Sequence, residues 1–251
     1  MLIRQQTTPL RFFRTTPAMR CPYLPDRIEV KLLTELGGPD ALVDHDRFTD
    51  AGFRRSHQFI YKPLCPSCQA CVPVRIPVED FAPSRAQRRN LRDNEAIFAT
   101  VVPAAVTSEQ FRLFAAYLHA RHDDGDMADM GFEDYRAMVE DSPVDTRLIE
   151  FRRGGPEGRL VACCLTDWLG NGISAVYSFF EPTAMRQGLG TYVILWLIEE
   201  ARAQRLPYVY LGYWISGARK MVYKQKFRPL EFLGQGGWRR METREISAAA
   251  T

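Results

Sequence analysis

The sequence predicts an α/β (α+β) fold in which a small Cys-containing N-terminal domain precedes a larger domain with a mixed, largely antiparallel sheet. The first hundred residues are rich in Pro, Arg and Cys and weakly periodic, whereas helical and strand-like patterns alternate strongly after residue 102. Two glycine-containing turns join three strand-like segments between residues 147 and 180, as in an antiparallel meander. We therefore expect two domains, residues 1–102 and residues 103–251.

The overall composition is that of a globular chain. Of the 251 residues, 46% are hydrophobic and 25% are charged, which excludes a mostly disordered protein. The net charge of +3 is too small to coat nucleic acid, so a site for a polyanion must be a local cluster of cations. There is no apolar segment typical of a secretion signal, and the longest apolar run, residues 192–198, is far shorter than the ~20 residues that span a bilayer. We expect a cytoplasmic protein with no membrane or DNA partner.

Four cysteines in the N-terminal part raise the question of a metal site. Cys65, Cys68 and Cys71 form a CxxCxxC pattern, and Cys21 can supply a fourth ligand. Tetrahedral zinc and a cubane iron–sulfur cluster each take four ligands. No His or second CxxC lies at a finger-like distance, and the same spacing suits ordinary buried thiols. A metal or iron–sulfur site and a set of reduced thiols both stay open, and no metal ligand is assigned.

A basic helix is predicted after the cysteines. Ser84 and Gln87 match a capping box, so a helix is expected to begin there. Its arginines are spaced i, i+3, i+4 and i+7, which places them on one face: Arg85, Arg88, Arg89 and Arg92. Residues 52–55 and 219–228 add further basic segments. Each run is either a solvated face or part of a surface for a polyanion, and the presence of three favours the polyanion.

The C-terminal part alternates between helices and strands. Thr107 and Gln110 form a second capping box, which predicts a helix as far as about residue 122. Another helix is expected over residues 132–139. Strands are predicted at 147–151, 160–169 and 173–180, with the turns RRGGPEG and GNG between them. An apolar helix after residue 188 and a strand within residues 206–215 complete this part.

The turn RQGLGTY at residues 186–192 resembles the acyl-donor site of the GNAT acyltransferase fold, in which a strand, a G-x-G turn, a helix and a strand follow one another. Gly188 and Gly190 let backbone N–H groups approach an anion at the helix N-terminus. Users of acetyl-CoA with this fold carry R/Q-x-x-G-x-G. Met185 stands where Arg or Gln is expected, which weakens acetyl-CoA as the donor. A plain tight turn before a core helix is the alternative.

Six motifs, in order over residues 21–238, resemble those of the aminoacyl-tRNA–protein transferases. They are CPYLP (21–25), GFRRSHQFIYKPLCPSCQACVPVR (52–75), SRAQRR (84–89), YLHARHDDGDM (117–127), GLGTYVILWLIE (188–199) and YLGYWISGARKMVYKQKFRP (210–229). The nearest resemblance is to the bacterial aspartate/glutamate leucyltransferases of the N-degron pathway, which are related to the eukaryotic arginyltransferases. Those eukaryotic relatives carry CxxC where this sequence has Cys21-Pro-Tyr-Leu24, and an adjacent Cys pair where it has CPSCQAC, so their iron–sulfur cluster is not carried over.

The resemblance implies a GNAT-like catalytic domain that uses charged tRNA in place of acetyl-CoA and requires no cofactor. It also implies that leucine moves from Leu-tRNA to the N-terminal amine of proteins beginning with Asp or Glu, which creates a degradation signal. Transfer of arginine, acetylation from acetyl-CoA and RNA binding by a non-catalytic zinc module are the alternatives. The sequence alone does not decide between leucine and arginine.

The candidate site residues are cations, aromatics and glycines within these motifs. The acceptor carboxylate needs a cation in a partly desolvated pocket, and the candidates are Arg54, Arg55, Lys220 and Lys224. Unpaired bases at the tRNA end stack on aromatic rings, and the candidates are Tyr213, Trp214 and Tyr223, each of which also fits the core. Phosphates of the tRNA are expected to contact Arg85, Arg88 and Arg89.

The predicted chemistry consists mainly of positioning. An aminoacyl ester is already activated, and holding the attacking amine against it contributes ~7–11 kcal/mol in favourable cases. An α-amino group has a pKa of ~7.7–8.0, so a strong base is not required. The Gly188–Gly190 turn is expected to hold terminal phosphates or an oxyanion. Tyr213, Lys220, Tyr223 and Lys224 are the catalytic candidates, together with His122, which is either a proton shuttle or a structural side chain.

Overall fold

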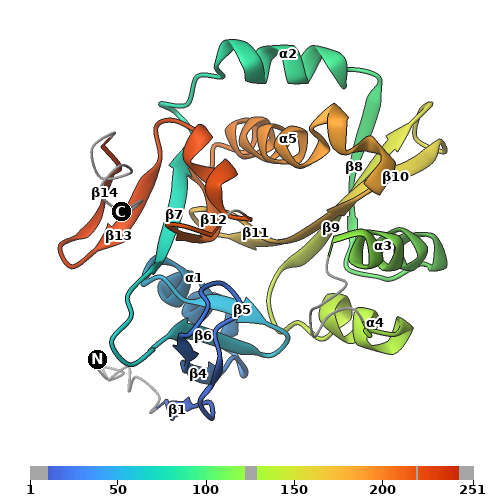
Figure 1. Ribbon diagram of the computed structural model, residues 1–251. Coiled ribbons are helices and arrows are strands. Elements are labelled where there is room, and N and C mark those ends of the chain that lie inside the picture. Colours follow the sequence, from blue (N-terminus) through green and yellow to red (C-terminus); the bar gives the residue numbers. More distant parts are fainter. Residues whose placement is uncertain (1–10, 122–128, 219, 243–251) are drawn as a thin grey trace, which may run out of the picture.

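The computed structural model of the chain describes residues 11–121, 129–218 and 220–242 (Figure 1). Its largest feature is a sheet of eight strands in the order β14-β13-β7-β12-β11-β10-β9-β8. The strands are β7 (Cys71–Pro77), β8 (Ile97–Pro103), β9 (Thr146–Arg153), β10 (Arg159–Leu169), β11 (Gly172–Phe180), β12 (Tyr208–Ile215), β13 (Glu231–Gly234) and β14 (Gly237–Arg240). All neighbouring pairs are antiparallel except β11 and β12. The mixed, largely antiparallel sheet predicted from the sequence is confirmed.

A smaller unit precedes this sheet. It contains a four-stranded sheet in the order β1-β4-β6-β5, made of β1 (Arg14–Thr15), β4 (Lys31–Glu35), β6 (Phe59–Pro63) and β5 (Arg54–Ser56). Helix α1 (Ala41–Asp50) packs on it, and β2 (Met19–Arg20) pairs with β3 (Ile28–Glu29) beside it. The expected division at residue 102 does not separate two sheets, because β7 lies before it, β8 spans it, and both strands pair with strands that lie after it. The sequence pattern missed this because isolated strands carry no signal of their pairing partners.

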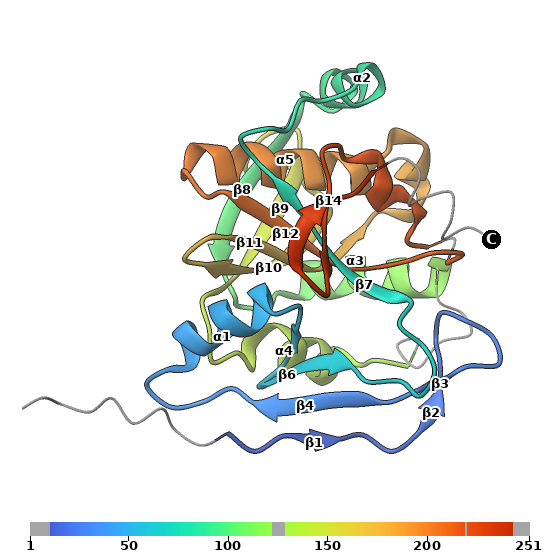
Figure 2. The ribbon, with the colours of Figure 1, turned by 90° about the vertical axis from the view of Figure 1, so that its left-hand side faces the viewer.

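The helices cover both faces of the large sheet. On one face, α5 (Leu189–Ala203) packs across β10, β11 and β12, and α2 (Arg85–Asp93) lies over α5. On the other face lie α3 (Ser108–Arg121), α4 (Phe132–Glu140) and the small N-terminal unit (Figure 1). The same order of layers appears after a turn of 90° (Figure 2). Within the described ranges, no helix combines the length and the apolar character needed to cross a membrane.

Local signals in the sequence explain where these elements begin. Ser84 and Gln87 form the predicted capping box at the start of α2. Gln110 donates its backbone N–H to Thr107 Oγ1 and accepts from the Thr107 N–H, which starts α3 in the same way. Gly154 and Gly155 adopt φ of +91° and +102° in the turn between β9 and β10, a region that favours glycine. Both predicted caps and the predicted meander of β9, β10 and β11 are confirmed.

An aromatic cluster joins α3 and α4 to the sheet. Phe114 of α3, Tyr135 of α4 and Phe179 of β11 are each 0% exposed. The Phe114 ring centroid lies 4.7 Å from that of Tyr135 and 5.4 Å from that of Phe179. Edge-to-face and tilted contacts of this kind add ~0.5–1.5 kcal/mol per pair to the area that is buried. This packing holds α3 and α4 against β11, the strand that borders the candidate site.

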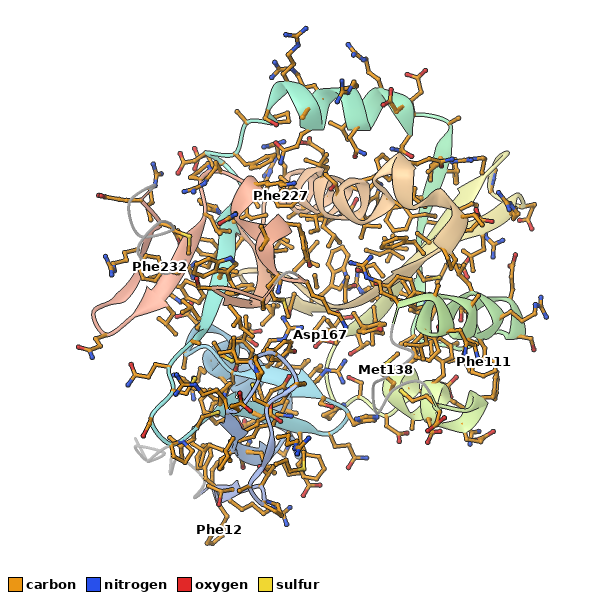
Figure 3. All side chains as sticks on the ribbon, in the orientation of Figure 1. Phe12, Phe111, Met138, Asp167, Phe227 and Phe232 are labelled. Carbon is orange, nitrogen blue, oxygen red and sulfur yellow. The ribbon has the colours of Figure 1, made fainter. Side chains whose placement is uncertain are left out.

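The small unit is attached to the large sheet through a buried ion pair. Arg55 of β5 donates Nε and Nη2 to the two carboxylate oxygens of Asp167 on β10, both at 2.7 Å. Thr146 Oγ1 donates to the same carboxylate at 2.6 Å, and His45 Nε2 lies 3.5 Å from it. Both charged side chains of the pair are 1% exposed. Burial lowers the pKa of His45, the Asp167 carboxylate opposes this shift, and the net shift favours the neutral imidazole. Asp167 lies between the two parts of the molecule (Figure 3).

Replacing Asp167 with alanine is expected to lower the free energy of unfolding by about 3–5 kcal/mol, because the buried Arg55 guanidinium loses its counter-charge. Asp145→Ala is the matched control, since Asp145 also pairs with an arginine, Arg147, but is 41% exposed. That control should change stability by no more than about 1 kcal/mol. Chemical denaturation of the two variants measures both values. Equal losses would contradict a special role for the buried pair.

Candidate active site

A cavity of about 570 Å³ opens where β11 and β12 separate. These two strands pair only over residues 172–174 and 208–210, and beyond Ser174 their backbones diverge. The small N-terminal unit, α3, α4 and α5 surround the gap. The residues that line the cavity are Tyr23, Arg54, Arg55, Ser56, His57, Tyr61, Tyr117, Arg121, Met130, Met138, Cys164, Ala175, Val176, Tyr177, Ser178, Val193, Ile194, Leu211, Tyr213, Lys220, Met221, Tyr223 and Lys224.

Arg54 fills the gap between the diverging strands. It follows Gly52 in the chain and reaches from β5 toward β11, where its Nη2 donates to the backbone carbonyls of Ala175 and Val176, each at 3.0 Å. On the β12 side its guanidinium lies against Gly212, where a built Cβ atom would overlap it. Gly212 has φ of +71° and lies at an irregularity in the pairing of β12 with β7. A glycine in the interior of a strand is therefore required both by the backbone conformation and by the arginine beside it.

Lys224 is a buried cation on the 3-10 helix η2 (Val222–Lys226), with 6% of its surface exposed. Its Nζ donates to the Tyr213 carbonyl oxygen at 2.5 Å, which holds the amine at the wall of the cavity. Burial, and secondarily the charge of Arg54, lowers the pKa of Lys224 to about 7. A substantial fraction of Lys224 is therefore neutral near pH 7, whereas an exposed lysine, with a pKa of about 10.5, is almost entirely protonated there.

Tyr213 connects the cavity to the N-terminal unit. Its hydroxyl donates to the Gly52 carbonyl at 2.9 Å, with the Tyr61 carbonyl at 3.3 Å, and its ring lies 6.4 Å from the Tyr61 ring. Burial raises the pKa of this hydroxyl well above its usual range. Tyr213 is only 7% exposed. The residue therefore positions the backbone that Lys224 contacts, and its hydroxyl stays protonated.

Arg55 was expected to bind an acceptor carboxylate, but its guanidinium is already hydrogen-bonded within the protein. Two of its nitrogens bind Asp167, and Nη1 donates to the His57 carbonyl at 3.0 Å. The reason is the alternation of a β-strand, because consecutive side chains point to opposite faces. Arg54 therefore points into the gap between β11 and β12, whereas Arg55 points toward β10.

The cavity is lined both by cations and by buried apolar side chains. Its cations are Arg54, Arg55, Arg121, Lys220 and Lys224. Its most deeply buried apolar side chains are Cys164, Val193, Ile194 and Leu211, with 0%, 1%, 6% and 4% of their surfaces exposed. Among the described residues, no Asp or Glu lines the cavity. An anionic group and an apolar group can therefore be bound side by side.

Several predicted site residues lie elsewhere. Trp214 is 6% exposed and belongs to the hydrophobic core, so it cannot stack a base as expected. Its side chain points away from that of Tyr213 because strand residues alternate. Gly188 and Gly190 are not among the described residues that line the cavity. Asn90 of α2 donates to the carbonyls of Gln187 and Gly188 and covers that turn.

The helix α2 places its arginines at the outer surface. Arg85, Arg88 and Arg89 are exposed, and none of them is among the described residues of the cavity. Helix α2 is separated from the sheet by α5 (Figure 1). Arg54, Arg55, Tyr213, Lys220, Tyr223 and Lys224 are the predicted residues that the fold does bring together around the cavity. His122 lies outside the described residues.

The four N-terminal cysteines lie near one another in the small unit. All are free thiols, and burial raises the pKa of Cys71 to about 12, with smaller contributions from Cys21, Cys65 and Cys68. Among residues 11–121, 129–218 and 220–242, no three His, Cys, Asp or Glu side chains are arranged to hold a metal ion. No metal or iron–sulfur site is therefore assigned to these cysteines.

Gly212 and Leu211 are among the residues of the site that were not singled out from the sequence. Gly212 lies within YLGYWI, and an isolated glycine in a strand is a signal of close backbone approach that was available. Leu211 carries no signal of its own, because an apolar residue in a strand ordinarily indicates core. Only the divergence of β11 and β12 turns this side chain into part of a binding surface.

The large sheet with its two diverging strands has a GNAT-like fold. The crystal structure of FemX has the same fold, with a TM-score of 0.52, 9% sequence identity and coverage of 96% of this chain and 91% of that one. The expected fold class is confirmed.

Sequence comparisons identify the family. The profile "Arginine-tRNA-protein transferase, N terminus" matches residues 19–89, and "Arginine-tRNA-protein transferase, C terminus" matches residues 109–234. A protein of Paramagnetospirillum magneticum named aspartate/glutamate leucyltransferase is 54% identical over 229 residues, which cover 91% of this chain and 93% of that protein. One of the same name from Gluconacetobacter diazotrophicus is 55% identical, over 92% of this chain and 89% of its own length. The chain belongs to the arginine-tRNA–protein transferase family and, within it, to the aspartate/glutamate leucyltransferases.

Proposed function

We propose that this chain transfers leucine from Leu-tRNA to the N-terminal amine of proteins that begin with Asp or Glu, and so marks them for degradation. The names of its close relatives support this activity. The observation that carries the mechanism is Lys224, a buried amine with a pKa of about 7 at the wall of a cationic cavity. Because its substrate is charged tRNA, the proposal places the enzyme in the cytoplasm.

Lys224 accepts the proton that the acceptor amine releases. The neutral amine nitrogen attacks the ester carbonyl carbon, a C–N bond forms, and the C–O bond to the terminal ribose breaks. The proton lost by the nitrogen passes to neutral Lys224, which can return it to the departing ribose oxygen. A proton acceptor works best when its pKa lies near the working pH. The leucyl ester is already activated, so this scheme requires no covalent intermediate and no cofactor.

The acceptor's Asp or Glu side chain binds on the cationic side of the cavity. Arg54 and Lys220 are the cations proposed to meet the carboxylate, since both line the cavity. Arg55 supports this site indirectly by anchoring β5 to β10 through Asp167. Tyr223, which is 38% exposed at the cavity, supplies a ring on which the terminal base can stack.

The exposed arginines of α2 are proposed to bind phosphates of the tRNA. Replacing Arg85, Arg88 and Arg89 together with alanine should raise KM for Leu-tRNA and leave kcat unchanged, because these residues lie away from the cavity. The slope of log affinity against log salt should become shallower by about 0.7–0.9 for each phosphate that the variant no longer neutralises. Arg159→Ala is the control, since its side chain is 61% exposed and belongs to β10 and not to α2. An unchanged salt slope in the triple variant would contradict the assignment.

Two alternatives are less consistent with the site. An arginyl side chain would meet several cations in the cavity, and no described lining residue carries an opposite charge. A user of acetyl-CoA would need the gap between β11 and β12 for its donor, but the Arg54 side chain occupies that gap and takes the free carbonyls of Ala175 and Val176. Both observations favour a leucyl ester as the donor.

The activity is tested with purified protein, Leu-tRNA or Arg-tRNA, and peptides that begin with Asp, Glu, Lys or Arg. Mass spectrometry should show addition of one leucine to the Asp and Glu peptides only. Addition of arginine without addition of leucine would refute the proposal that Leu-tRNA is the donor. Modification of the Lys and Arg peptides would refute the proposal that the acceptor must begin with Asp or Glu.

A further inference from the structure

The apolar side of the cavity is a rigid wall contributed by three elements that pack on one another. Cys164 comes from β10, Val193 and Ile194 come from α5, and Leu211 comes from β12. Helix α5 packs across β10, β11 and β12, which brings the four side chains to one side of the gap. All four belong to the main hydrophobic core and also border the cavity. These four side chains therefore form an apolar wall of the cavity that packs against the hydrophobic core.

Two other apolar lining residues, both methionines, are of a different kind. Met130 and Met138 are partly exposed and come from α4 and the segment before it. Methionine adapts its shape to what it contacts, so it discriminates weakly between ligands of different size. A wall of short or branched side chains held by the core does not adapt in this way. Discrimination by size is therefore expected at the wall of Cys164, Val193, Ile194 and Leu211.

We infer that Cys164, Val193, Ile194 and Leu211 form the subsite that holds the leucine side chain of the aminoacyl ester and that they limit the size of the transferred residue. This inference rests on the proposed function. Val193 and Ile194 of the wall lie on α5, on one face of the large sheet, whereas Arg54 comes from the small N-terminal unit on the opposite face. A leucyl ester whose carbonyl group lies in the cavity beside Lys224 can thus place its isobutyl group on the wall while the acceptor carboxylate meets Arg54.

The inference explains how one cavity serves two substrates of opposite character. Binding of the leucine side chain is stabilised by its removal from water, and binding of the acceptor carboxylate is stabilised by the charges of Arg54 and Lys220. The leucine side chain binds the apolar wall and the carboxylate binds the cations, so the two groups do not compete for the same surface. Changes in the wall should therefore alter the choice of transferred residue and leave the choice of acceptor unchanged.

The test compares two leucine truncations in the same core. Leu211→Ala removes most of a side chain from the wall and so enlarges the cavity there. Leu197→Ala removes an equally sized, fully buried side chain of α5 that is not among the described lining residues. The same tRNA is charged with leucine, methionine or phenylalanine, and kcat/KM is measured for each with an Asp-initiated peptide. Leu211→Ala should raise the phenylalanine-to-leucine ratio by about 10- to 100-fold, since one methylene in an apolar pocket is already worth about 10- to 200-fold. Leu197→Ala should leave the ratio within about twofold of that of the wild-type protein.

A milder pair covers the case in which the truncated proteins do not fold. Ile194→Val removes one methyl group from the wall, and Ile198→Val removes one from the next turn of α5, where the side chain is 0% exposed and is not among the described lining residues. Only Ile194→Val should shift the ratio of methionine to leucine transfer, by a few-fold. The preference for Asp over Lys peptides should stay constant in both.

Three results would overturn the inference: an unchanged ratio in the wall variants, equal changes in the wall and control variants, or a shift produced by Met138→Ala instead. Failure of the proposed function looks different, because the wild-type protein would then transfer no leucine from Leu-tRNA to any peptide.

Discussion

Lys224→Met is expected to lower kcat for leucyl transfer by about 100- to 10,000-fold, the range that a positioned proton acceptor contributes. The protein should remain folded, because methionine has a similar length and no charge to bury, and Lys224 is 6% exposed. The loss should appear mainly in kcat, since Arg54 and Lys220 still bind the acceptor. Lys226→Met, a change of a second lysine on the same 3-10 helix that is not among the described lining residues, is the matched control and should retain activity.

The same residue determines the expected pH dependence. Lys224 accepts a proton only when neutral, so the wild-type kcat should rise as pH increases through about 7. Its pKa in the folded protein lies below the usual lysine value of 10.5. Between these values the unfolded state binds the extra proton, so the Lys224 contribution to stability improves as pH rises across that window. Lys224→Met should remove both effects, and an unchanged pH–rate profile would contradict the assignment.

Gly212→Ala is expected to lower kcat/KM by about 100-fold, the scale of loss that a displacement of roughly 1 Å at a site can produce. The new Cβ would overlap the Arg54 guanidinium and must push it out of the gap between β11 and β12. Arg54 would then lose its bonds to Ala175 and Val176. Because Arg54 also lowers the pKa of Lys224, the rise of kcat with pH should move to higher pH.

Gly217→Ala is the control for backbone strain. Gly217 has φ of +79°, close to the +71° of Gly212, but nothing lies within 4 Å of a Cβ built there. Both variants should bear a conformational cost of about 1–2 kcal/mol in unfolding free energy. Only Gly212→Ala should also lose activity and shift the pH profile. Equal activity in the two variants would show that Arg54 is not positioned by Gly212.

The elements that the sequence predicted best are those with local signals. The caps at Ser84 and Thr107 and the glycine turn before β10 depend on residues a few positions apart, so their spacing in the sequence is enough. The placement of β7 depends on contacts that are distant in the sequence. This strand pairs with β12 and β13, which follow it by more than a hundred residues, and no local pattern encodes such pairing.

The site was predictable in composition but not in arrangement. The motifs contained Arg54, Lys220, Tyr223 and Lys224, which do line one cavity. The sequence did not show that Arg55 turns away to Asp167 or that Trp214 is buried, because both outcomes depend on which face of a strand meets which neighbour. The low pKa of Lys224 likewise follows from burial that only the fold creates.

A crystal structure with leucyl-adenosine joined by an amide in place of the ester tests the central claim most directly. The amide is less reactive toward the acceptor, so the complex should persist. The claim predicts that the leucine side chain contacts Leu211 and Ile194, and that the carbonyl carbon lies in the cavity beside Lys224. Binding of the analogue outside this cavity, or with its leucine side chain away from Leu211 and Ile194, would contradict it.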